Sequence, residues 1–154
     1  MTAQLFSKTL YDEDFNLWVE QTVQQVRSQQ IESLDWEHLI EEIEALGAAD
    51  KRELRKRVTL IMSHILCLLF WLPESERQEC ARGWRLTIRE QRRQVKQLLK
   101  DSPSLKPYLT SLLESCYEDA REDVIYKSPL YWDIKDLISD TLPFTLTDIL
   151  EEEY

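Results

Sequence analysis

Glycine is scarce in this chain: its 154 residues include only Gly47 and Gly83. Loops that cradle phosphate groups need several positions without a Cβ atom, so this scarcity argues against a phosphate-binding loop. It also argues against an all-β fold, because β-hairpins use glycine in their tight turns. The sequence therefore favours helices joined by short connections.

Long hydrophobic runs and a leader segment are missing as well. The longest strongly apolar run, residues 65–72, is far shorter than the roughly 20 residues of a membrane span. Residues 1–6 have neither a basic start nor a long apolar stretch, so we expect no signal peptide and no membrane contact. The three cysteines, Cys67, Cys80 and Cys116, are odd in number and none has CxxC spacing. We therefore expect a cytoplasmic protein with free thiols, two of which lie on apolar helical stripes.

The net charge is −10, and the charged residues are distributed along the chain in three blocks. Residues 1–50 contain 11 acidic and 2 basic side chains, residues 51–100 contain 5 acidic and 13 basic ones, and residues 101–154 contain 13 acidic and 4 basic ones. Unlike charges attract, so this order favours packing of the acidic flanks onto the basic middle.

Apolar residues recur at the 3.6-residue period in five long segments. These predict helices over residues 12–28, 36–46, 51–71 and 76–99, and from Ser102-Pro103 to about residue 125. Gly47 is expected to end the second helix in a left-handed turn, and Pro73 the third. The third helix is apolar nearly all round after Val58, so we expect it to be central.

The predicted fold is an all-α antiparallel bundle of about five helices. Residues 1–9 are expected to be a flexible arm, residues 10–150 one helical domain, and residues 151–154 a frayed tail. Near the end of the helical domain, a short helix is expected around Ile134 to Ile138. A last helix is expected at a capping box formed by Thr145 and Asp148.

Several blocks in order resemble a known family. They are Tyr11-Asp12-Glu13-Asp14-Phe15 with Trp18, residues 34–44 with Gly47, residues 60–66 with His64, residues 84–92, residues 101–105, Tyr117 with Ala120, and residues 143–146. Together they are similar to the bacterial family named domain of unknown function twenty-nine, across residues 10–150. The resemblance implies a small cytoplasmic helical protein and no particular reaction. Residues 126–140 look unlike the usual end of that family.

A metal site is one functional hypothesis. Asp35 and His38 are three residues apart and His38 and Glu42 four apart, so either pair can share a helix face, and His64 could join them. Histidine and carboxylate ligands suit a single zinc or iron ion. The alternative is that Asp35 caps a helix, His38 lies at the solvent edge and His64 is a hydrogen-bonded core residue.

The basic side of residues 76–99 is a second candidate. Arg85, Arg89 and Arg92 belong to a row of arginines and lysines that could follow phosphates, yet the acidic chain would repel nucleic acid at long range. Nucleic-acid binding is therefore the weaker interpretation. Pairing of this face with acidic helices is the stronger one.

No catalytic set is complete, since no cysteine or serine has a histidine in a suitable arrangement. We expect neither an enzyme nor a bound cofactor. The leading interpretation is a non-enzymatic protein-interaction module that binds a protein partner or forms a homodimer. Its proposed anchors are Arg85, Arg89 and Arg92 with the aromatic pair Tyr131 and Trp132, because arginine and aromatic side chains dominate protein interfaces.

Overall fold

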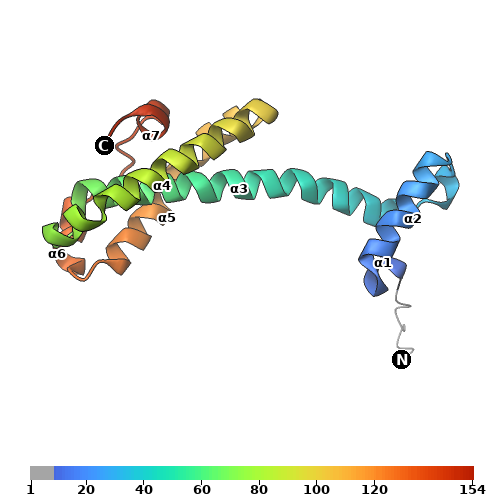
Figure 1. Cartoon of the computed structure of the whole chain (residues 1–154), viewed down its shortest axis with the longest axis horizontal. Helices are drawn as coiled ribbons and strands as arrows, with labels where there is room; N and C mark the ends of the chain where they lie inside the picture. Colours follow the sequence, from blue (N-terminus) through green and yellow to red (C-terminus); the bar gives the residue numbers. More distant parts are fainter. Residues whose placement is uncertain (1–8) are drawn as a thin grey trace. The chain divides into compact units, whose positions relative to one another are not determined.

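A computed structural model describes residues 9–154, so the expected arm lies outside the described residues except for Thr9. All regular elements within residues 9–154 are helical, which confirms the all-α prediction. They are α1 (Leu10–Glu13), α2 (Phe15–Arg27), the short 3₁₀ turn η1 (Ile31–Ser33), α3 (Trp36–Phe70), α4 (Glu74–Asp101), α5 (Leu105–Lys127), α6 (Tyr131–Leu137) and α7 (Leu146–Glu151) (Figure 1). The chain divides into two compact units, Met1–Ala48 and Ala49–Tyr154, called here the N-terminal and C-terminal units.

Helix α3 corrects the prediction of two separate helices. It runs without a break from Trp36 to Phe70, and Gly47 lies inside it with a negative φ angle. The neighbours Ala45, Leu46 and Ala48 are good helix formers, and one glycine costs only about 1 kcal/mol relative to alanine. That cost is too small to end a helix whose two sides both continue it.

The ends of α4 and α5 also differ from the prediction. Helix α4 already begins at Glu74, directly after Pro73. Ser102 ends it, donating its N–H to the Leu98 carbonyl at 2.9 Å, so Ser102 is not the N-terminal cap of α5. Close helix packing does not explain Gly83, because no atom of another helix comes within 4 Å of the position where a Cβ would stand.

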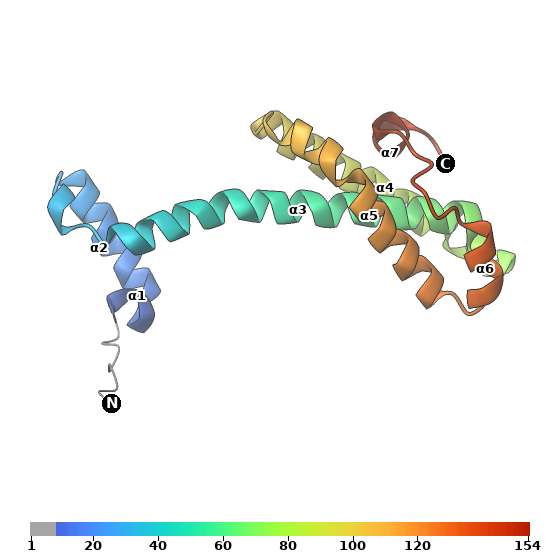
Figure 2. The ribbon, with the colours of Figure 1, turned by 180° about the vertical axis from the view of Figure 1, so that it is seen from behind.

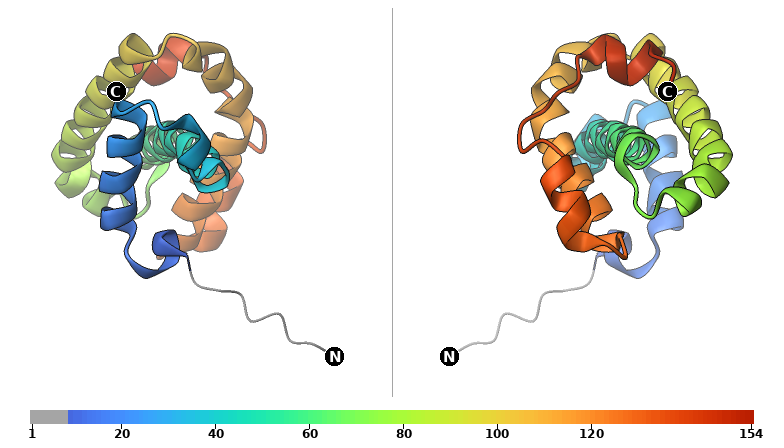
Figure 3. Two further views of the ribbon diagram at one scale, coloured as in Figure 1. Left: turned by 90° about the vertical axis from the view of Figure 1, so that its right-hand side faces the viewer. Right: turned by 90° about the vertical axis from the view of Figure 1, so that its left-hand side faces the viewer.

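The core of the C-terminal unit forms around the second half of α3. Helices α4 and α5 flank this half, as the views along α3 show (Figure 3). Its fully buried side chains from this helix are Leu54, Val58, Ile61, Met62, Ile65 and Leu66. They pack with Val95, Leu109, Tyr117, Ile134 and Ile149 from α4, α5, α6 and α7. The central position of this segment within its unit is therefore confirmed.

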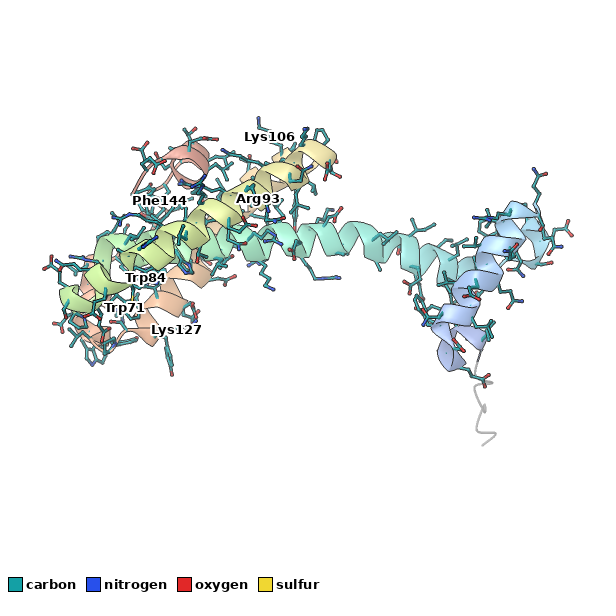
Figure 4. All side chains as sticks on the ribbon, in the orientation of Figure 1. Trp71, Trp84, Arg93, Lys106, Lys127 and Phe144 are labelled. Atoms are coloured by element: carbon teal, nitrogen blue, oxygen red, sulfur yellow. The ribbon has the colours of Figure 1, made fainter. Side chains whose placement is uncertain are left out.

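Aromatic residues and the last two helices close this unit. Trp71 and Trp84 meet edge to face, with ring centroids 5.9 Å apart (Figure 4). Helix α6 follows α5 directly and is best seen from behind (Figure 2). The predicted capping box of α7 is confirmed, since the Thr145 N–H donates to the Asp148 carboxylate at 2.7 Å and the Asp148 N–H to the Thr145 hydroxyl at 3.2 Å.

The N-terminal unit consists of α1, α2, η1 and the start of α3. The helix predicted over residues 12–28 is divided at Asp14, whose carboxylate accepts the Leu17 N–H at 3.0 Å and so caps α2. Trp18 and Leu34 are its buried apolar residues. Among residues 9–154 no helix combines the length and the apolar character needed to cross a bilayer.

Candidate functional site

A groove lies along the basic side of α4 in the C-terminal unit. Its volume is about 730 Å³. One wall consists of Leu86, Ile88 and six basic side chains of α4, namely Arg82, Arg85, Arg89, Arg92, Arg93 and Lys96. The other wall is the end of the chain, residues 150–154, with Glu151, Glu152 and Glu153. We call it the α4 groove; Figure 1 shows α7 beside α4, and Figure 4 labels Arg93.

Arg92 joins the two walls of the α4 groove. Its Nε donates to the Ile149 carbonyl at 2.8 Å, and its Nη2 donates to the carbonyls of Asp148 at 3.1 Å and Glu152 at 2.8 Å. The last carbonyls of a helix have no partner within the helix, so a guanidinium placed there satisfies them. Burial lowers the pKa of Arg92, whereas the nearby acidic residues raise it.

Other basic side chains of α4 contact the same segment. Arg85 Nε donates to the main-chain oxygen of Tyr154 at 2.6 Å, and Lys96 pairs with Glu151 at 2.8 Å. The residues expected to fray are therefore in contact with α4, and the acidic C-terminal flank does meet the basic middle. Arg82 and Arg89 have no ion pair or hydrogen bond with another side chain or carbonyl of the described residues. The groove thus brings Arg85, Arg89 and Arg92 together but leaves Arg89 without a partner there.

The aromatic pair stands at the start of α6. The Tyr131 and Trp132 rings are 4.9 Å apart at an interplanar angle of 85°. Tyr131 packs against the core, whereas Trp132 is 74% exposed. The Lys135 ammonium lies 5.9 Å from the Tyr131 ring and 5.6 Å from the Trp132 ring, within reach of a cation–π interaction. Trp132 is therefore an exposed aromatic side chain whose ring contacts Tyr131 and Lys135.

A polar and aromatic cluster lies in the N-terminal unit. His38 Nδ1 is 2.6 Å from Asp35 Oδ2, which also accepts the Trp18 indole N–H at 3.2 Å. The His38 ring stacks on Tyr11 at 4.0 Å, and the Tyr11 hydroxyl donates to Glu42 Oε1 at 2.5 Å. These contacts tie α1 and α2 to the start of α3.

The ionisation of this cluster follows from its contacts. The hydrogen bond with Asp35 raises the pKa of His38, although partial burial opposes this. Burial by itself would raise the pKa of Asp35, but the hydrogen bonds from His38 and Trp18 lower it overall. Donation to Glu42 raises the pKa of Tyr11 to about 12. The cluster therefore favours an imidazolium–carboxylate pair.

The predicted metal ligands are only partly together. Asp35 and His38 are in contact, and Glu42 joins them through Tyr11. His64 belongs to the C-terminal unit, where its Nδ1 lies 2.9 Å from the Leu60 carbonyl. No group of three or more His, Cys, Asp or Glu side chains within residues 9–154 is arranged to hold a metal ion. The zinc or iron site stays a prediction.

Exposed apolar side chains are numerous in the N-terminal unit. Ten large hydrophobic side chains between residues 15 and 46 are at least 37% exposed: Phe15, Leu17, Val19, Val23 and Val26 on α2, Ile31 on η1, and Trp36, Ile40, Ile43 and Leu46 on α3. The α3 residues recur every three or four positions and so form one stripe. We call Trp36, Ile40, Ile43 and Leu46 the α3 stripe.

Comparison with known protein families gives a match that includes both the α4 groove and the α3 stripe. A family model described as Domain of unknown function DUF29 matches residues 10–154. The chain belongs to the DUF29 family. The match confirms the resemblance seen in the sequence and includes all seven α-helices of the described residues. No curated protein and no solved structure matches the chain.

Two features of this DUF29 protein escaped the sequence interpretation. The apolar period predicted a helix over residues 36–46 but gave no sign that Ile43 would be 59% exposed. Periodicity reports a helix face and is silent on what covers it. The contact of Arg92 with α7 was also missed, because main-chain carbonyls carry no sequence signal.

Proposed function

We propose that this DUF29 protein is a non-enzymatic protein-interaction module, and that its N-terminal unit binds a basic amphipathic helix of a partner protein. The observation that supports this is the exposed apolar surface of α2 and α3. Leu46 is 70% exposed and Ile43 is 59% exposed, although both lie on a regular helix. Exposed apolar side chains that share one helix face, as those of the α3 stripe do, mark interaction sites in folded proteins.

The charge of the N-terminal unit indicates the chemistry of the partner. Residues 9–48 contain ten acidic side chains and one arginine, Arg27. Glu37, Glu41 and Glu44 each follow a residue of the α3 stripe and border it. Two such surfaces would repel each other, whereas lysines beside an apolar helix face would meet these carboxylates. The charge thus favours a basic partner over a second copy.

The mode of binding follows from the spacing of the α3 stripe. Its residues occupy positions that pack against a facing helix as in a coiled coil. Apolar contact would supply most of the affinity, and the bordering glutamates would select the partner and its orientation. Trp132, which lies in the other unit, is not needed for this contact.

The test uses a fluorescein-labelled amphipathic peptide with leucine on one helix face and lysine on the other. We expect Ile40→Ser with Ile43→Ser to weaken its binding by at least about tenfold, because each loses buried apolar contact. The matched control is Ala45→Ser, which changes an exposed residue of the same helix turn, and Trp132→Ala is the control in the other unit. Both controls should bind as the unaltered chain does.

Equal binding by the Ile40→Ser/Ile43→Ser chain and the controls would overturn this proposal. Light scattering on the same variants tests the second-copy alternative. A dimer that the paired serine changes convert to a monomer would assign the stripe to self-association instead.

A further inference from the structure

We infer that the α4 groove is a second binding site, which takes an acidic, leucine-containing segment of a partner protein in place of the tail residues 152–154. This surface lies in the C-terminal unit and does not depend on the α3 stripe. Its support comes from the charges, contacts and exposure of the groove residues.

The contacts of α7 with α4 leave Arg82 and Arg89 of the groove without a partner among the described residues. Ile149 is fully buried in the core, and Arg92 binds main-chain carbonyls rather than carboxylates. Lys96 with Glu151 is the one ion pair across the groove among the described residues. Anchoring of α7 therefore depends on apolar packing and on Arg92, and hardly on the acidic side chains.

Arginines of the groove form a row on α4. Six basic and three acidic side chains line the groove. Arg93 is engaged by Glu90 of the same helix at 2.8 Å, whereas Arg82 and Arg89 have no partner among the described residues. Arg82, Arg85 and Arg89 follow one another at intervals of three and four residues, so they face one side. Guanidinium groups bind carboxylates with two parallel hydrogen bonds, which makes this row suited to carboxylate side chains.

An apolar residue beside this row favours a peptide over nucleic acid. Leu86 lines the groove and is 56% exposed. A leucine of an acidic segment can cover it, whereas the phosphate groups of a nucleic acid cannot.

The tail itself occupies one part of this row. Arg85 donates to the Tyr154 main-chain oxygen at 2.6 Å, and this is the contact that a partner must replace. The side chains of Glu152 and Glu153 are exposed and make no ion pair with α4 among the described residues. They bring negative charge to the groove without neutralising Arg82 or Arg89, so they should weaken the binding of another acidic segment.

The experiment measures fluorescence anisotropy with a labelled peptide made of Glu-Glu-Leu repeats and the full chain. We expect Arg82→Gln with Arg89→Gln to weaken binding by at least about tenfold, because both lose their bidentate carboxylate contacts. The paired change Glu152→Gln with Glu153→Gln should tighten it by roughly threefold through reduced repulsion. Lys100→Gln with Lys106→Gln removes the same charge outside the groove and is the matched control, with little expected effect.

Equal loss in the arginine and the lysine double variants would show general charge attraction and overturn the inference. Absence of binding at low salt by the unaltered chain would overturn it as well. A single-stranded DNA of matched charge that binds more tightly than the peptide, and loses this binding with Arg82→Gln and Arg89→Gln, would assign the groove to nucleic acid. Helical content measured by circular dichroism checks that each variant is folded. Ile40 and Ile43 are unchanged throughout, so the outcome is independent of the function proposed for the N-terminal unit.

Discussion

The three cysteine thiols differ in access and therefore in reactivity. Burial raises the pKa of Cys67 to about 12 and also raises that of Cys116, while Cys80 is exposed on α4. The thiolate is the reactive form, so buried thiols of high pKa react slowly. We expect a dithiobis-nitrobenzoate reagent to modify Cys80 quickly in the native protein and all three thiols in denaturant. Rapid modification that persists in Cys80→Ser would contradict this.

The Asp35–His38 pair predicts a pH-dependent stability. The raised pKa of His38 means that its contribution is fully present below its ordinary pKa of about 6.5 and is lost as the pH rises through the folded value. The lowered pKa of Asp35 means that its contribution is present above about 3.8 and is lost as the pH falls through the folded value. The pair should therefore stabilise the N-terminal unit most between these two ordinary values.

Proton NMR of the two histidines tests this directly. We expect His38 to titrate above 6.5 in the unaltered chain and at a lower pH in Asp35→Asn, because the partner carboxylate is then missing. His64→Gln assigns the signals by removing the other imidazole. An unchanged His38 titration in Asp35→Asn would assign the shift to another cause.

At the scale of elements, the two glycines sit in helices without a local need for glycine. Neither has a positive φ angle, and a Cβ at either position would come within 4 Å of no atom beyond the adjacent residues and the local helix backbone. Replacing Gly47 or Gly83 with alanine should therefore stabilise the fold by about 0.5–1 kcal/mol each. Urea denaturation measures this, and Ala45→Gly is the reverse control, with a similar loss expected. Destabilisation by Gly47→Ala would point to a contact that this position makes in an assembly.

Local patterns predicted the elements well and their ends unevenly. The Thr145–Asp148 capping box marked the start of α7 correctly, because both reciprocal hydrogen bonds are local. Gly47 was wrong as a helix end, and Ser102-Pro103 was wrong as the start of α5. The glycine signal is a weak preference of about 1 kcal/mol, and the helix formers around Gly47 outweigh it. Ser102 instead ends α4, and α5 begins three residues later.

The candidate sites were less accessible to sequence reasoning. The row containing Arg85, Arg89 and Arg92 was visible as a helix face, yet the sequence could not say that α7 covers part of it. The spacing of Asp35 and His38 indicated that they could share a helix face, and the two side chains are in contact, since residues three apart on a helix are neighbours. His64 has no such local tie to them, so its placement depended on tertiary structure.

For the whole molecule, the stability contributed by apolar burial should be concentrated in the C-terminal unit. Leu109 is fully buried among α3, α5 and their neighbours, whereas Ile43 of the N-terminal unit is 59% exposed. Leu109→Ala should cost about 2–5 kcal/mol of unfolding free energy through lost contacts and a cavity. Ile43→Ala should cost less than about 0.5 kcal/mol, as exposed substitutions do. Similar losses in urea titrations of the two variants would show that Ile43 is covered in solution.

Hydrogen exchange within helix α7 can reveal how often this part of the protein opens. A helix of six residues does not persist alone, so its hydrogen bonds last only while Arg92 and the core hold it. The Ile149 amide proton, bonded to the Thr145 carbonyl at 3.1 Å, exchanges with deuterium when this short helix unwinds or detaches from the core. Its exchange rate therefore measures the free energy of this opening in the intact, unlabelled chain.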